Sequence, residues 1–428
     1  MHAIGRLTLT LLLLTGCGFV KNDISHRDLG VDARAVVDSG TPTDADAPID
    51  GSSADAAVMV GADATRAVLV SIGERVILPT LRDFEADAQA LVAATAAARD
   101  SGSAESRAAA REAWREAMRS WERVEMLQVG PTGLVTVTAG GRALRDEIYA
   151  WPLLNRCRVD QETLEPAHAD PALLAAESLN VRGLAALEYL LFFEAPNNGC
   201  SASHSINASG AWAALDAAAI TSRRAAYAHS AAVLVASRAT ELRWAWDPSG
   251  ENFLGNLRTA GTGSDVYMTA QAGLNAVSDA LFYLYKEVTD SKVGIPMGLR
   301  LECTTELCPE QVESRYAGAS LDHMRVNLEA FRDAYLGGPP EVTDAPGFDD
   351  LLRSVGATDL DARIQAGIAA AFTALAAVDT PFESALTNDY ADAVTFHDAL
   401  RNIGGLFRID VLTMLDLELP MRIEGDND

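Results

Sequence analysis

The chain is poor in aromatic and in basic residues. Only 6% of its 428 residues are Phe, Trp or Tyr, while alanine recurs throughout, a composition that favours helices packed through small side chains over aromatic-rich β-sandwiches. The 34 Lys and Arg are outnumbered by 60 Asp and Glu, which gives a net charge of −26. Such a chain repels phosphate backbones, so nucleic acid is excluded as a general partner. The hydrophobic fraction of 49% indicates a globular protein with a sizeable core.

The common catalytic motifs are missing as well. The sequence contains no His-Glu-x-x-His zinc helix, no Gly-x-Ser-x-Gly nucleophile elbow and no Walker phosphate loop. It also has no dinucleotide-binding glycine pattern placed after a strand. We therefore assign no catalytic residue from these motifs.

The first 17 residues are predicted to be a lipoprotein signal peptide. Arg6 precedes the apolar run 7–14, which is too short to span a bilayer, and Leu14-Thr-Gly-Cys17 resembles the lipobox of bacterial lipoproteins. We expect Cys17 to become the lipidated first residue, and the alternative is a plain secretory signal with an incidental cysteine. Gly18 replaces the Asp of an inner-membrane retention signal. The sequence therefore predicts a cell-envelope protein anchored in the outer membrane, facing the periplasm or the cell surface.

Residues 18–63 are predicted to form a disordered tether. Nine Asp alternate there with Ala, Ser, Gly, Thr and Pro, and no aromatic residue appears from Lys21 onward. A segment this polar cannot bury enough apolar surface to offset the entropy lost on ordering it. The folded body is expected to begin at Ala64.

Beyond the tether, apolar residues recur in helical steps of three and four. No strand-like alternation of useful length appears, so we predict an all-α fold of two packed helical-bundle halves, over 64–250 and 251–428. Segments bearing Gly, Pro or Asn separate the expected helices. These helices are expected at 76–98, 104–129, 171–193, 211–246, 264–288, 314–335, 347–355, 360–377 and 390–417.

Four cysteines remain after the lipobox, enough for two disulfides in an exported chain. Cys303 and Cys308 share one short polar segment, which favours their pairing and leaves Cys157 to pair with Cys200. The sequence does not exclude the other two connectivities. A thiolate metal site is disfavoured, because no Cys-x-x-Cys unit is present and the expected compartment is oxidising. We interpret the disulfides as structural.

Two carboxylates lie within apolar stripes. Glu125 shares a predicted helix face with two tryptophans, and leucines flank Glu188 on the inner face of a later helix. An unpaired buried charge is costly, so each of these residues requires a proton, a cation or a partner. One interpretation is a buried salt bridge or hydrogen bond, with Arg142, Arg145 or Arg182 as partners. The other is a functional cation or polar ligand.

The seven histidines add no clear ligand to these carboxylates. Only His323 and His397, each beside an aspartate, could ligate a cation. We expect both to be exposed or capped.

A series of short motifs extends over most of the chain after the tether. The stretches are 114–130 with its Trp...Trp...Glu-x4-Gly pattern, 148–152, the helix of Gly183, 313–316 and 335–337. In their order and spacing the chain resembles the imelysin family. These bacterial envelope proteins are filed under the M75 metallopeptidases and are related to the periplasmic component of iron-uptake systems.

The resemblance implies a two-domain all-α fold derived from a duplication, with a site in the cleft between the halves. In the family this site centres on a Gly-x-His-x-x-Glu motif. Gly183 and Glu188 match its glycine and glutamate, whereas Ala185 stands where the family has histidine. An alanine methyl can neither ligate a metal nor move a proton, so the family's metal-dependent chemistry is not expected to carry over unchanged.

We therefore favour a lipid-anchored, non-catalytic binding protein that uses Glu125 and Glu188 to hold a ligand in the cleft. The candidate ligands are iron or another divalent cation, an iron-bearing ligand and a polar small molecule, and the sequence fixes no cofactor. One alternative is a metallopeptidase with Glu188 as general base, although no two-histidine ligand set is visible. The other is a structural lipoprotein with a decayed site that binds an envelope protein partner.

Overall fold

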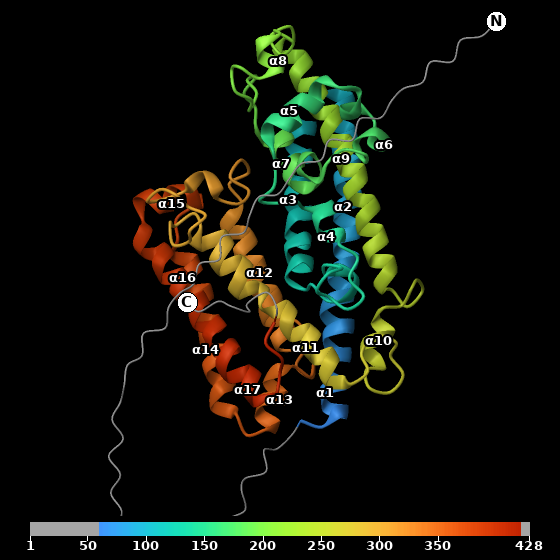
Figure 1. Cartoon of the computed structure of the whole chain (residues 1–428), viewed down its shortest axis with the longest axis vertical. Helices are drawn as coiled ribbons and strands as arrows, with labels where there is room; N and C mark the ends of the chain where they lie inside the picture. Colours follow the sequence, from blue (N-terminus) through green and yellow to red (C-terminus); the bar gives the residue numbers. More distant parts are fainter. Residues whose placement is uncertain (1–59, 421–428) are drawn as a thin grey trace, which may run out of the picture. The chain divides into compact units, whose positions relative to one another are not determined.

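The structure is a computed structural model that describes residues 60–420. The predicted signal peptide, Cys17 and nearly all of the tether lie outside the described residues. Within 60–420 the chain forms α-, 3-10 and π-helices joined by turns, and no β-strand occurs there (Figure 1). The prediction of an all-α fold is confirmed.

Up to residue 250, three long helices and one short buried helix pack together. α2 contacts both α3 and α9, and α7 lies against α9 and α3 (Figure 1). The helices of this part are α1 (Ala62–Ile72), η1 (Gly73–Ile77), α2 (Leu78–Ser101), α3 (Ala104–Met126), η2 (Gly130–Thr132), α4 (Leu144–Ile148), α5 (Arg156–Leu164), η3 (Pro166–Ala169), α6 (Pro171–Leu174), η4 (Leu179–Val181), α7 (Gly183–Phe192), α8 (Ser205–Ala208) and α9 (Ala217–Trp246).

After residue 250, α12 packs against α3 of the first part, and α14 packs against α16. The division at 250/251 stays a prediction, while the buried apolar core contains residues from both sides of it. The helices of this part are α10 (Leu254–Arg258), α11 (Ala270–Leu281), η5 (Leu284–Gly294), η6 (Pro309–Gln311), α12 (Ser320–Tyr335), α13 (Phe348–Ser354), α14 (Thr358–Ala377), α15 (Phe382–Asn388), α16 (Tyr390–Gly405), η7 (Leu406–Val411) and α17 (Leu412–Met414).

The expected hairpin of two long helices is present as α2 and α3. Gly102 ends α2 in the left-handed region, at φ 60°, a conformation that glycine adopts at little cost. Ser103 then caps α3, because its hydroxyl accepts a hydrogen bond from the amide of Ser106. Helical structure begins earlier than predicted, since α1 starts at Ala62, inside the predicted tether.

Several predicted helices are wrong in their first turns: those expected to start at 211 and 264 begin at Ala217 and Ala270. The expected helix over 171–193 is broken into α6, η4 and α7, since Ser178 and Arg182 are extended. The hydroxyl of Ser178 bonds to the side chain of Asn180, a local contact that competes with helix. The expected helix over 314–335 begins only at Ser320. Apolar spacing alone did not reveal these interruptions.

The structure forms the two favoured disulfides, Cys157–Cys200 and Cys303–Cys308. No single described helix is long and apolar enough to cross a membrane. The pair α14 and α15, bent by 82° at its break, meets the length and composition criteria only when taken together.

Candidate functional site

Glu125 lies in the interior and is fully buried, as its apolar stripe indicated. Its Oε1 accepts a hydrogen bond of 2.8 Å from Nε of Arg145 on α4. Of the three arginines considered from the sequence, Arg145 is the one that pairs with it, whereas Arg142 and Arg182 bind other carboxylates. The salt-bridge interpretation therefore describes Glu125 correctly.

Glu188 on α7 is held by backbone amides. Its Oε1 accepts hydrogen bonds from the amides of Tyr316 at 2.8 Å and Ala317 at 3.0 Å. These amides are available because residues 313–318 form turns and not the helix expected from 314 onward. Burial raises the pKa of Glu188 to about 7, although the two amides favour the charged form. Burial thus favours the protonated form of Glu188 more than the two amides favour its charged form.

A buried lysine lies among carboxylates that come from distant parts of the chain. Nζ of Lys292 lies 2.5 Å from Oε2 of Glu122, 3.1 Å from Oε1 of Glu313 and 3.6 Å from Oε2 of Glu125. All four side chains are fully buried. Together with a neighbouring histidine they form what we call the acid cluster: Glu122, Glu125, Lys292, Glu313 and His323.

His323 lies on the opposite side of two of these carboxylates. Its Nδ1 is 3.4 Å from Oε1 of Glu122 and 3.6 Å from Oε2 of Glu313, distances at or beyond the limit of a hydrogen bond. These three atoms have no hydrogen-bond partner among the described residues. The expectation that His323 and His397 would be exposed or capped is wrong, since they are 1% and 5% exposed. Each lies on a helix face that turns toward the core.

Two polar side chains fix the carboxylates in place. The hydroxyl of Tyr149 donates to Oε1 of Glu313 at 2.9 Å. Nδ2 of Asn327 donates to Oε2 of Glu122 at 2.9 Å, while Oδ1 of Asn327 accepts from Lys292 at 3.1 Å. Glu122 and Glu313 therefore each have one oxygen engaged on the lysine side and one facing His323.

Burial and mutual repulsion make part of the acid cluster protonatable near neutral pH. Burial and the charge of Glu313 raise the pKa of Glu122 to about 7. Burial alone would lower the pKa of His323, but the carboxylates of Glu122 and Glu313 raise it above its usual value. The same carboxylates keep the buried ammonium of Lys292 charged by raising its pKa. The raised pKa values of Glu122 and His323 both favour the protonated forms of these groups.

The three atoms without partners are spaced like the ligands of a small cation. Cation–ligand bonds of about 2.0–2.2 Å in tetrahedral geometry place neighbouring ligand atoms about 3.3–3.6 Å apart. Nδ1 of His323 lies at such distances from Oε1 of Glu122 and Oε2 of Glu313, and ligand atoms of all three side chains lie within 4.8 Å of one another. A histidine and two carboxylates suit Fe, Mn or Zn. These residues fit a divalent cation.

Sequence reasoning missed most of the acid cluster. Glu122 follows Met118 by four residues and precedes Glu125 by three, a spacing that could have placed it on the inner face. Lys292 lies in the π-helical segment η5, where a period of 3.6 does not predict which residues are buried. Glu313 was noted only as part of a motif, because it lies outside any helix.

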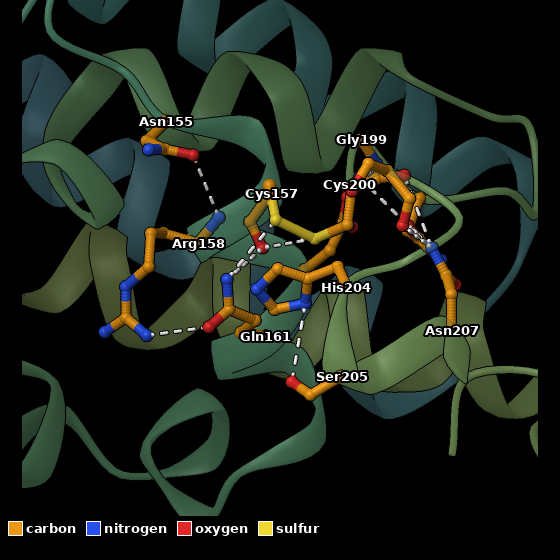
Figure 2. The surroundings of a disulfide bond; sticks show 12 residues. Asn155, Cys157, Arg158, Gln161, Gly199, Cys200, His204, Ser205 and Asn207 are labelled. Carbon is orange, nitrogen blue, oxygen red and sulfur yellow. Dashed lines mark hydrogen bonds between the residues drawn. A yellow bond between two sulfur atoms is a disulfide. The ribbon is translucent and has the colours of Figure 1, made fainter. Parts of the chain in front are cut away.

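A second group of potential ligands surrounds a disulfide. Figure 2 shows the imidazole of His204 beside the bond between Cys157 and Cys200, and ligand atoms of the three residues lie within 4.8 Å of one another. Both sulfurs are engaged in the disulfide, so they are not available as thiolates. This agrees with a structural role for these cysteines.

Comparison with known families identifies the chain. The imelysin family model, named for the M75 peptidases, matches residues 77–403. The chain belongs to the imelysin family. No curated protein matches it significantly in sequence.

Two solved structures have the same imelysin fold. An iron-regulated protein A precursor from Parabacteroides distasonis ATCC 8503 has a TM-score of 0.66 and 18% identity, over 84% of this chain and 97% of that one. An imelysin-like protein from Psychrobacter arcticum 273-4 has a TM-score of 0.65 and 19% identity, over 85% of this chain and 98% of that one. At these identities the likeness concerns the fold.

The motif positions of this imelysin have different roles. Gly183 starts α7 at φ 77°, and a Cβ there would lie 2.5 Å from the carbonyl oxygen of Ile148, so glycine permits the close approach of α7 to α4. Ala185 is buried and supplies no ligand. The imidazole of the acid cluster is that of His323 on α12.

Proposed function

We propose that this imelysin is a non-catalytic envelope protein that binds a divalent cation at Glu122, Glu313 and His323. The observation that carries the proposal is the convergence of three buried ligand atoms, in which the imidazole nitrogen lies 3.4 and 3.6 Å from the two carboxylate oxygens. None of the three atoms forms a hydrogen bond among the described residues, and burying such atoms without one is costly. Lys292 contacts the opposite oxygens of the same carboxylates and offsets part of their charge. Glu125 and Glu188, expected to be the ligands, would then support the site from beside it.

The pKa values indicate that a cation would compete with protons for the carboxylate of Glu122 and the imidazole of His323. Carboxylates and imidazoles bind metals in their deprotonated forms. Because the pKa of Glu122 is about 7 and that of His323 is raised, binding would release protons near neutrality. Affinity is therefore expected to rise between pH 6 and pH 8.

Burial supports binding and argues against peptide hydrolysis. Glu122, Glu313 and His323 are at most 1% exposed, so a polypeptide substrate could not reach a metal held between them. Cation exchange would require local opening and is expected to be slow. The Parabacteroides protein is described as iron-regulated, which makes iron the first cation to test here.

Thermal unfolding of the purified full chain, titrated with Fe(II), Mn(II) or Zn(II), tests this proposal. At one hundred times the dissociation constant, a bound cation stabilises the protein by about 2.7 kcal/mol. His323→Gln should abolish the shift, and His397→Gln is the matched control because it alters a buried histidine outside the acid cluster.

The outcomes separate the competing functions. A shift retained in His323→Gln would place the cation elsewhere. No shift with any of the three cations would overturn the proposal and favour a structural lipoprotein whose acid cluster serves stability alone. Peptide cleavage abolished by a chelator would instead support the metallopeptidase alternative.

The proposed location rests on the amino-terminal sequence. The apolar run 7–14 and the tetrapeptide ending at Cys17 support lipid anchoring in the outer membrane, through a tether over residues 18–61. Metabolic labelling with a radioactive fatty acid tests the anchor. Cys17→Ser should lose the label and leave the membrane fraction, and label retained in this variant would contradict the anchor.

A further inference from the structure

A second site candidate lies at one end of the helices α2, α3, α7 and α9 (Figure 1). A cavity of about 620 Å³ opens there, within the range of about 300–1,000 Å³ typical of small-ligand sites. Small residues of α2 and α9 face it, including Ala98, Ala218 and Ala228, together with Gly102 at the end of α2. None of the residues of the acid cluster lines this cavity.

The walls of the cavity combine apolar and cationic groups. Leu190, Leu191 and Phe193, at the end of α7, provide apolar surface. The titratable residues that line it are four arginines and one glutamate, in a chain whose net charge is −26. Three of these arginines form ion pairs with carboxylates, so the local excess is the single positive charge of Arg107, opposite in sign to the charge of the whole molecule.

The four arginines are engaged to different degrees. Arg111 pairs with Glu194 at 2.6 Å, and Arg99 pairs with Asp100. Arg107 donates to the carbonyl of Gly102 and forms no ion pair within 4 Å among residues 60–420. Its charge is the one available to an incoming anion.

Arg224 adds a buried cationic group to the wall. Its side chain is 5% exposed, forms an ion pair with the buried carboxylate of Asp160 at 3.4 Å and donates to the carbonyls of Phe193 and Ala195, so its charge is already balanced. Residues at the N-termini of α3 and α9 and at the C-termini of α2 and α7 line the cavity, so opposing helix dipoles meet there and the preference for an anion rests on Arg107.

We propose that this cavity binds an amphipathic organic carboxylate, an aliphatic chain with one anionic head. The chain would lie against Leu190, Leu191 and Phe193, where its burial is favourable. The carboxylate would accept charge-assisted hydrogen bonds from Arg107, since a guanidinium fork matches a carboxylate in geometry. The cavity is independent of the cation site, so either proposal can fail alone.

Isothermal titration of the full chain with dodecanoate, below its micelle concentration, tests this inference. We expect one molecule bound per chain, with an affinity that falls as salt is added, because Arg107 is only half-buried. Arg107→Ser should weaken binding about tenfold, the loss expected for one charge-assisted contact. Arg115→Ser, on the same helix but outside the cavity, is the matched control and should leave binding unchanged.

Two further measurements make the test decisive. Ala218→Trp, at an exposed lining position on α9, should fill the cavity and abolish binding without changing the melting temperature. Dodecyltrimethylammonium has the same chain and the opposite charge, so it should not bind. Equal binding of the two amphiphiles, or unchanged dodecanoate binding in both Arg107→Ser and Ala218→Trp, would overturn the inference, as would no binding of dodecanoate.

Discussion

Replacing Lys292 with methionine tests the electrostatics of the acid cluster. The ammonium contacts Glu122 and Glu313 at 2.5 and 3.1 Å, and removing it leaves buried carboxylates without their cation. Glu122 already takes up a proton near pH 7, so the further response is to protonate Glu313. Burial alone would raise the pKa of Glu313, but Lys292 and His323 lower it from the ordinary 4.5 to about 2. From the ordinary pKa, at about 1.4 kcal/mol per pH unit, protonation costs about 4 kcal/mol at pH 7.5 and about 1.4 kcal/mol at pH 5.5. The first value agrees with the 3–5 kcal/mol lost when a buried ion pair is broken.

Urea unfolding followed by tryptophan fluorescence measures this loss, because Trp114, Trp121 and Trp246 are fully buried. The penalty of Lys292→Met should decrease as the pH falls, since the folded variant binds a proton that the unfolded chain does not. Lys286→Met is the control, because this lysine is partly exposed and its ion pair at 3.4 Å should contribute at most about 1 kcal/mol. A penalty equal at both pH values, or no larger than that of Lys286→Met, would refute the reasoning.

Three further predictions concern neighbouring parts of the fold. Burial raises the pKa of Glu188 from 4.5 to about 7, so the stability that its proton contributes is fully present below pH 4.5 and is lost as the pH rises through 7. Glu188→Gln should remove this pH dependence, which amounts to at most about 3 kcal/mol. If the wild type and this variant change in stability in parallel between pH 5 and 8, the prediction is contradicted. Gly183→Ala should lower the free energy of unfolding by about 2 kcal/mol or more, because the added Cβ meets a backbone carbonyl and the residue has φ 77°. A decrease below about 0.5 kcal/mol in denaturant unfolding would show that α7 can shift to accommodate the methyl group. Replacing Cys157 and Cys200 with serine opens a disulfide-closed loop of 43 residues and should cost about 2–4 kcal/mol, whereas an unchanged unfolding midpoint would contradict a structural role.

Local sequence determined most of the helices. The break at Gly102 and the cap at Ser103 follow from intrinsic backbone preferences, so the hairpin of α2 and α3 was predictable. The errors arose where a turn interrupts an apolar run, as in the breaks before α7 and α12. There, side-chain contacts and positive φ angles decide the structure, and hydrophobic periodicity does not report them.

For the site, the sequence by itself determined that Glu125 and Glu188 would be buried, because each lies on an apolar helix face. It could not determine their partners. Tertiary structure alone brought Lys292 and Glu313 to Glu122, across 170 residues or more of sequence, and turned His323 toward them. Burial then raised the cost of every unpaired charge, so long-range packing decided which of the chain's many acids could form a cation site.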